Sequence, residues 1–173
     1  MPDIKALLAK AKPRERTVKV MLDGATAGEI ERLEAELLEV SEDWQPSDLA
    51  EEHPGRGIAA QIAELRDKAR ESEAEFRFRY IGDEEYSSLL AAHPSTSKEE
   101  LFDSDSFPRA LIVASCVDPV MTVDEAKELF KVINQGQIQR LFDAAWDVHN
   151  AAGLVPFSLA ASALLAAVGG GEK

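Results

Sequence analysis

Three histidines and one cysteine are the residues of this chain most often used in chemistry, and their positions argue against a shared site. His53 and His93 each precede a proline, whereas His149 lies near the end of a predicted helix, where a cation interacts favourably with the helix dipole. No pair among these residues has the spacing of a zinc site. Cys116 lies in the apolar run ALIVASCVDP, where a thiol is usually a small buried hydrophobe. The pattern therefore predicts neither a metal centre nor a nucleophile.

Two stretches begin like ligand-binding motifs but lack the residues that complete them. DSDSFPRALIVA, from Asp103, starts like a calcium loop, yet it has no glycine at the sixth position and no glutamate at the twelfth. VGGGEK resembles a phosphate loop, but it follows a predicted helix and lacks Ser or Thr after its lysine. No serine lies in a Gly-x-Ser-x-Gly turn. We therefore expect a protein that is not an enzyme and that uses no metal or other cofactor.

The composition indicates a folded, acidic protein. Of its 173 residues, 45% are hydrophobic, which is enough for the core of one domain. The formal net charge of -13 argues against a nucleic-acid partner and against an anionic membrane surface, because both require basic faces. The start, MPDIKALLAKAK, has no signal-peptide core, and the longest apolar stretch is too short to span a bilayer. A single cysteine fits a reducing compartment, so we expect a cytoplasmic protein.

Residues 1–82 are predicted to form a short basic helix, a strand, two helices and a second strand. RTVKVML and EFRFRYI both alternate apolar and polar residues, as half-buried strands do. Between them lie two amphipathic helices, TAGEIERLEAELLEV, opened by a predicted capping box of Thr26 and Glu29, and IAAQIAELRDKARESEA. The pattern predicts a small two-stranded β element covered by a helical hairpin, and it leaves open whether the two strands pair with each other.

Residues 83–173 are predicted to be all helical. FPRALIVASCV is apolar on nearly all sides and has Pro108 in its first turn, so it is the expected buried central helix. A capping box of Thr122 and Glu125 opens the next helix, and NQGQIQRLFDAAWDVHNAAG forms another. The expected fold class is α+β and predominantly α-helical. The two parts, 1–82 and 83–173, are expected to form one compact unit.

Charge is distributed unevenly along the chain. Residues 5–19 hold six basic residues and one acidic residue, whereas residues 23–52 hold eleven acidic residues and one basic residue. One interpretation is that these are two solvated faces, which is usual for runs of charge. The other is that the basic arm of one copy docks on the acidic helix of another, in a contact that salt would weaken.

The closing stretch, VPFSLAASALLAAVGGGEK, is the strongest candidate for a binding surface. On a helix its residues from Pro156 to Val168 make an uncharged apolar stripe. It either packs within its own chain, under the segment from Ala110 to Val117, or is covered by another chain, as a helix laid in a groove. The predicted partner-binding residues are Phe157, Leu159, Ala160, Leu164, Leu165 and Val168.

Three further patterns carry a resemblance. The first is an apolar helix that ends in Asp-Pro and is followed by a short acidic helix, in FPRALIVASCVDPVMTVDEAKELF. The second is an x-L-F-x-A-A helix that ends in Asn, in NQGQIQRLFDAAWDVHN. The third is the stretch VPFSLAASA, which follows them. These stretches resemble the tail assembly chaperones of long-tailed, siphovirus-type phages and prophages of actinobacteria. The first half is similar more loosely, through KPRERTVKVMLDG, an acidic helix pair and an F-R-F-R strand. The shared patterns include no catalytic signature.

The resemblance implies a non-enzymatic role in phage tail assembly. Such chaperones bind the long tape-measure protein and keep it soluble in the host cytoplasm, and they are usually absent from the mature virion. Many of these phages also make a longer form of the chaperone by a programmed ribosomal frameshift. The closing Gly-Gly-Gly-Glu-Lys can be encoded by runs of G and A on which a ribosome slips. The expected partners are the tape-measure protein, further copies of this chain and that frameshifted longer form.

Two other classes of function remain open. A structural head-tail connector or tail terminator would form a closed ring without the tape-measure protein, and finished virions would contain it. An acidic mimic of nucleic acid would inhibit a DNA-binding host protein. The negative charge of residues 23–52 favours the mimic, whereas the basic start and the apolar second half argue against it.

Overall fold

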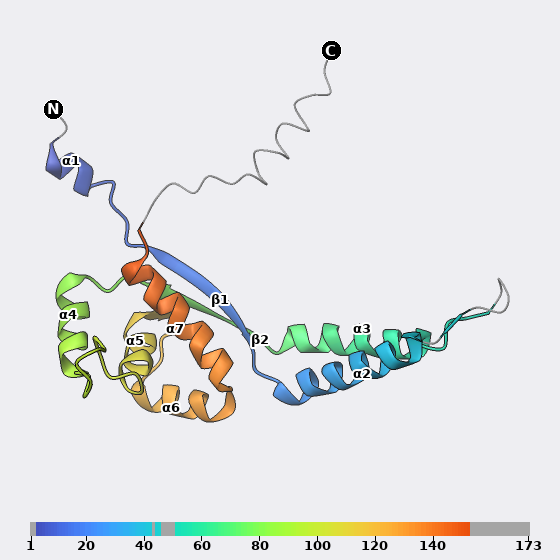
Figure 1. Ribbon diagram of the computed structural model, residues 1–173. Helices are drawn as coiled ribbons and strands as arrows, with labels where there is room; N and C mark the ends of the chain where they lie inside the picture. Colours follow the sequence, from blue (N-terminus) through green and yellow to red (C-terminus); the bar gives the residue numbers. More distant parts are fainter. Residues whose placement is uncertain (1–2, 43, 46–50, 153–173) are drawn as a thin grey trace, which may run out of the picture.

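The computed structural model describes residues 3–42, 44–45 and 51–152 (Figure 1). Within them the chain is α+β and mostly helical, which confirms the predicted class. The elements follow in the order α1 (Ile4–Leu8), β1 (Glu15–Met21), α2 (Gly24–Glu42), α3 (Arg56–Glu71), β2 (Glu73–Arg79), α4 (Asp83–Ala92), α5 (Phe107–Ser115), β3 (Cys116–Asp118), α6 (Val123–Val132) and α7 (Gln135–Asn150).

The three strands form one antiparallel sheet in the order β1-β2-β3. The two strands predicted from alternation do pair, with Val18 opposite Phe76 and Glu15 opposite Arg79. The period of two places Val20, Phe76 and Phe78 on the buried face and Glu15, Lys19, Arg77 and Arg79 on the other.

The third strand differs from the predicted two-stranded element and from the all-helical second half. The helix predicted to run through Val117 ends at Ser115, and Cys116 is already extended. Pro119 keeps the residue before it, Asp118, out of the helical region, so the helix must end before Asp118. The Asp118–Pro119 bond is cis. The short extended segment pairs with β2 and covers the end of that strand.

The sheet and helices α4–α7 form the part of the molecule that we call the body. Helix α7 packs on β1 and β2, and α5 packs on α7 and β2. The core between them holds Phe78, Phe107, Leu111, Ile112 and Leu141, each fully buried. One polar contact also fixes α7 on the sheet: the Gln137 side-chain Nε2 donates to the Met21 carbonyl over 2.6 Å. Both parts of the predicted division, 1–82 and 83–173, thus supply residues to this core.

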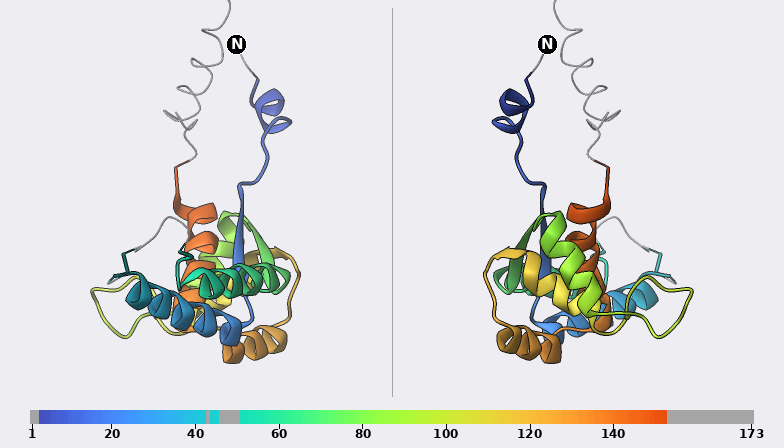
Figure 2. Two further views of the ribbon diagram at one scale, coloured as in Figure 1. Left: turned by 90° about the vertical axis from the view of Figure 1, so that its right-hand side faces the viewer. Right: turned by 90° about the vertical axis from the view of Figure 1, so that its left-hand side faces the viewer.

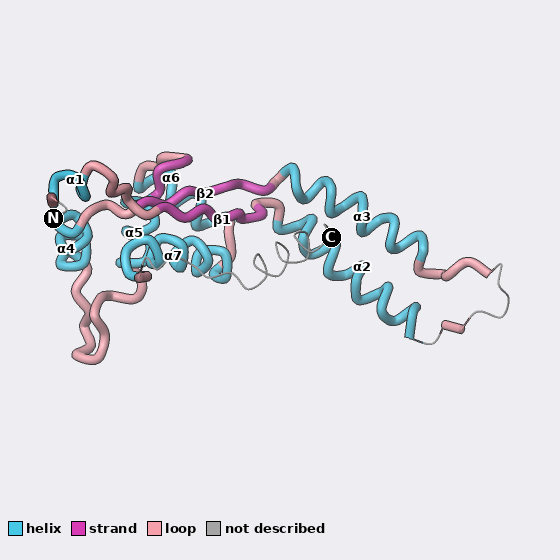
Figure 3. Tube along the Cα trace, turned by 90° about the horizontal axis from the view of Figure 1, so that it is seen from above, coloured by secondary structure: helices cyan, strands magenta, loops and turns pink. Residues whose placement is uncertain are grey.

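Helices α2 and α3, which we call the hairpin, continue the β1–β2 pair away from the body (Figure 3). The Leu22 N–H donates to the Ser72 carbonyl over 3.1 Å, which adds one bond to the ladder before the helices begin. The two helices pack on each other, with Leu33, Ile62 and Ala69 buried between them. The predicted helical hairpin is therefore present, but it extends beyond the sheet instead of covering it.

The start of α2 corrects a second prediction. The capping box predicted from Thr26 and Glu29 does not form. Instead the Asp23 carboxylate accepts from the Thr26 N–H over 3.0 Å, so Asp23 is the capping residue. Aspartate competes well with threonine at this position, and the helix therefore begins earlier than predicted. The box predicted at Thr122 and Glu125 does form, and Asn134 with Gln137 makes another at the start of α7.

Candidate binding groove on α4, α5 and α6

An apolar hollow lies between α4, α5 and α6. Its volume is about 710 Å³. The three helices lie next to one another on one side of the body (Figure 2, right). The lining is mostly aliphatic: Leu89 from α4, Ala110, Val113 and Ala114 from α5, and Val123, Ala126 and Phe130 from α6.

Helix α5 supplies the floor of this groove because it has apolar residues on two opposite faces. One face, with Leu111, Ile112 and Ser115, is fully buried against the core. The other face carries Ala110, Val113 and Ala114, which are only half-buried. The sequence predicts a central helix buried on all sides, and the structure instead leaves one of its faces open along the groove. That all-round apolarity was the signal for the groove in the sequence.

Charged and polar side chains border the groove. Asp105, His93, Arg109 and Lys127 line its edge. The guanidinium of Arg109 lies 5.9 Å from the centre of the Phe130 ring, which is within range of a cation–π interaction. The small alanines of the floor allow close approach, since packed helices lie about 8–10 Å apart depending on the side chains between them. The groove therefore suits an apolar helical face whose flanks are polar.

Of the acidic pair that begins like a calcium loop, Asp103 instead holds together the turn that precedes α5. The Asp103 carboxylate accepts from the N–H groups of Asp105 and Ser106 and from the Ser106 hydroxyl, at 3.2, 2.7 and 2.7 Å. The Ser106 side chain chiefly, with its N–H, lowers the pKa of Asp103. Within residues 3–42, 44–45 and 51–152, no group of three or more His, Cys, Asp or Glu side chains is arranged to hold a metal.

The cysteine is a buried core residue, as predicted. Cys116 is 5% exposed, and its Sγ lies 3.2 Å from the Pro119 carbonyl. Burial raises the pKa of the Cys116 thiol, which keeps it in the unreactive protonated form.

The histidines lie on separate elements and each has a local partner. His53 accepts from the Gly55 N–H over 2.9 Å, and His93 lies 2.8 Å from the Ser106 hydroxyl. His149 corrects a prediction, because it is held as a neutral ring and not as a cation. Its Nε2 accepts from the Ile81 N–H over 3.3 Å, so its Nδ1 carries the proton and donates to the Ala145 carbonyl over 2.7 Å. Burial lowers the pKa of His149.

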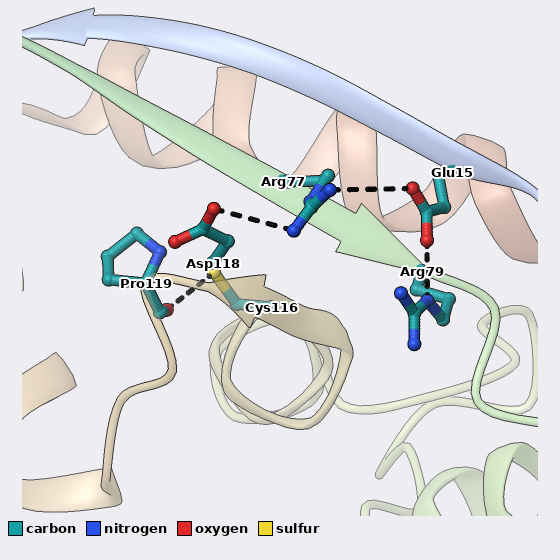
Figure 4. A network of polar contacts seen from close by, with 6 residues as sticks. All are labelled: Glu15, Arg77, Arg79, Cys116, Asp118 and Pro119. Atoms are coloured by element: carbon teal, nitrogen blue, oxygen red, sulfur yellow. Dashed lines mark hydrogen bonds and ion pairs between the residues drawn. The ribbon is translucent and has the colours of Figure 1, made fainter.

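A network of charged residues ties the three strands together on the exposed face of the sheet (Figure 4). Glu15 pairs with Arg79 over 2.6 Å, and Arg77 lies between Glu15 and Asp118 at 4.0 and 3.4 Å. These pairs join β1, β2 and β3 across their shared register. They are explained as cross-strand contacts of a sheet and need no ligand.

The predicted partner-binding residues, Phe157, Leu159, Ala160, Leu164, Leu165 and Val168, lie outside the described residues. Both predicted environments of that stretch therefore stay predictions. Within the part of the chain that is described, no helix has both the length and the apolar character needed to cross a bilayer.

Comparisons with known proteins leave the family open. Neither a scan against protein-family models nor searches of curated proteins and of solved structures finds a match. The groove on α4, α5 and α6 is therefore the observation on which a function rests, and the resemblance stays a prediction.

Proposed function

We propose that this protein is a non-enzymatic tail assembly chaperone of a long-tailed phage or prophage, which binds the tape-measure protein and keeps it soluble. The observation that carries the proposal is the apolar groove on α4, α5 and α6. An apolar groove of this size on a protein surface is a common mark of an interaction site. Two of the stretches that resemble the chaperones form α5, β3, α6 and α7, which include the floor and one wall of this groove.

The charge of the protein supports the same role. A tape-measure protein is long, helical and prone to aggregate, so a chaperone must cover its apolar faces and keep the complex dispersed. The net charge of -13 supplies repulsion between complexes. Many copies would bind along one partner chain, so a modest affinity at each groove would give strong overall binding.

The test is co-expression with the large helical protein encoded just downstream. We expect the soluble fraction of that protein to rise when this chain is present, and light scattering to give a complex with many copies of this chain per partner. A partner that stays insoluble would contradict the proposal. If this chain alone then forms a closed ring that is also found in finished virions, the connector or tail-terminator function replaces it.

Two matched variants separate the groove from the rest of the surface. Val123 lines the groove and is 59% exposed, whereas Val120 lies three residues earlier, outside it, and is 80% exposed. Val123→Asp places a charge at the groove and suits the first turn of α6, where an acidic residue is stabilising. We expect Val123→Asp to lower partner solubilisation and Val120→Asp to leave it unchanged. Equal effects of both variants on partner solubilisation would show that the groove is not where the partner binds.

Truncation after Leu154 tests the six predicted tail residues separately. If they bind the partner, truncation lowers the soluble fraction. If they instead cover the groove of their own chain, truncation raises partner binding, because the groove is then open to the partner.

A further inference from the structure

The N-terminal arm, residues 3–14, carries apolar side chains that nothing in the described chain covers. Helix α1 has no buried residue, and Ile4, Leu7 and Leu8 are 63%, 51% and 64% exposed. The three lie on one face of the helix, at positions i, i+3 and i+4. The arm stands away from the body in two perpendicular views (Figures 1 and 2).

A second apolar hollow lies on the hairpin, and we call it the hairpin groove. Its volume is about 450 Å³. It is lined by Glu34, Leu37, Leu38 and Ser41 from α2 and by Ala59, Ile62, Ala63 and Arg66 from α3. One end is bounded by the ion pair of Arg66 with Glu34, at 2.6 Å. Leu38 is 63% exposed, although it lies on the face that lines the groove.

The charges of the arm and the hairpin groove are complementary. Glu34 and Glu42 flank Leu38 at i−4 and i+4, and Glu31 lies one turn further along the same face of α2. Neither Glu31 nor Glu42 has an ion pair among the described residues.

On the arm, Lys5, Lys10 and Lys12 also have no ion pair among the described residues. The arm therefore has an uncovered apolar stripe with cations that are unpaired among the described residues. The hairpin has an apolar groove with anions that are likewise unpaired.

We infer that α1 of one copy docks in the hairpin groove of a second copy. Ile4, Leu7 and Leu8 then cover Leu38 and its apolar neighbours, and the lysines of the arm face Glu31 and Glu42. The sizes are compatible, because at 1.5 Å per residue the α2 part of the groove from Glu34 to Ser41 spans about 12 Å and α1 is about 8 Å long. The arm and the hairpin lie at opposite ends of the molecule, so the contact joins different copies (Figure 1).

The consequence is an assembly without a twofold axis. A contact between two different surfaces of the same protein repeats from copy to copy, and it gives an open chain or a closed ring according to the rotation at each step. Such a chain could array many copies of the body, each with its own groove on α4, α5 and α6. The inference rests on the arm and the hairpin alone. It can therefore hold if the chaperone proposal fails, and the chaperone proposal can hold if this inference fails.

The first test is the mass of the full chain in solution at low and high salt, by sedimentation velocity. We expect assemblies larger than a dimer at low salt that grow with protein concentration and shrink as salt rises, because salt screens the charged rim. A chain that is monomeric at every concentration at low salt overturns the inference.

The second test uses two variants that each remove one side of the contact. Leu7→Asp with Leu8→Asp alters the arm, and Leu38→Asp alters the hairpin groove. All three positions are at least half exposed, so the fold tolerates these changes. Each variant alone should be monomeric, whereas an equimolar mixture should form a dimer and stop there, because only one working arm and one working groove remain. A mixture that stays monomeric, or a variant that assembles like the wild type, contradicts the contact.

Charge reversal gives the specific control. Lys10→Glu with Lys12→Glu, or Glu31→Lys with Glu42→Lys, should each weaken assembly, and one chain that carries all four changes should regain it. The matched control is Lys98→Glu with Lys131→Glu, which changes the net charge as the first pair does but lies outside the arm and the hairpin groove. Assembly that follows net charge alone, with no rescue in the fourfold variant, would overturn the inference.

Discussion

The body and the hairpin are both built from amphipathic helices, yet they differ in how much they bury. In the body, Phe78, Phe107 and Leu141 are fully buried, because α5 and α7 pack on a sheet and on each other. In the hairpin, α2 and α3 have mainly each other, and Leu38 stays 63% exposed. The same kind of sequence pattern therefore gives a core in one region and an open interface in the other. The number of packing partners decides between the two results.

The largest expected effect is a loss of stability when one buried leucine in each region is replaced by alanine. Leu141→Ala should lower the free energy of unfolding by about 2–5 kcal/mol, because it opens a cavity in a core that cannot collapse around it. Leu33→Ala should cost less, since the hairpin is two helices thick. It should act locally, lowering hydrogen-exchange protection in α2 and α3 while the body keeps its own. Denaturant unfolding with hydrogen exchange measures both, and equal global effects would contradict the comparison.

The next effect is a dependence on pH that belongs to the body alone. His149 is neutral in the folded chain, and burial lowers its pKa from the ordinary value of 6.5. Below pH 6.5 the unfolded chain binds a proton that the folded chain does not, so stability is full above pH 6.5 and falls as the pH drops toward the lowered pKa. Urea midpoints measured over this range should fall for the wild type.

His149→Phe is the matched variant for this prediction. It should be less stable at every pH, because the Ile81 N–H loses its acceptor, but its midpoint should no longer fall just below pH 6.5. The carboxylates with lowered pKa values, such as Asp23 and Glu125, act at lower pH and should leave this window unchanged. An unchanged slope in His149→Phe would assign the dependence to another group.

Much of the fold could be predicted from local pattern, and the misses have physical causes. Alternation located β1 and β2, and helical periodicity located α2, α3 and α7, because both patterns reflect burial on one face. The third strand was missed because ALIVASCV is also a good helical sequence. Pro119 and the open edge of β2 decided its conformation. The start of α2 was misplaced because Asp23 and Thr26 are both good caps and spacing alone does not rank them.

The candidate sites could be predicted only in part. The all-round apolarity of α5 predicted a fully buried helix, whereas one of its faces is open, and the groove also needs Leu89 and Phe130, which only the tertiary arrangement brings beside it. The charge asymmetry between residues 5–19 and 23–52 allowed two interpretations, two solvated faces or a contact between copies. The hairpin groove that would receive the arm depends on how α2 meets α3. The charge and the exposed positions of a segment can be predicted from its local sequence, whereas the shape of each groove depends on tertiary packing.

A smaller effect comes from a helix cap in the body. Thr122→Ala removes an acceptor for the Glu125 N–H at the start of α6 and should cost about 1 kcal/mol in the free energy of unfolding. At the start of α2 the capping residue is Asp23, so Glu29→Ala should leave the capping of the hairpin unchanged. Denaturant midpoints and helicity measure both variants. A loss of α2 capping in Glu29→Ala would return the box to the position that the sequence alone predicts.

The smallest expected effect concerns two ion pairs that look alike. Arg66 with Glu34 in the hairpin and Arg79 with Glu15 on the sheet are both 2.6 Å long and largely exposed. Exposed pairs contribute less than about 1 kcal/mol, so Arg66→Met and Arg79→Met should leave the denaturant midpoint nearly unchanged. The two variants should differ in assembly instead, because Arg66 bounds the hairpin groove and Arg79 does not. A shift in mass for Arg66→Met alone would show that the hairpin serves contact between copies, whereas equal masses would leave both pairs as surface charge.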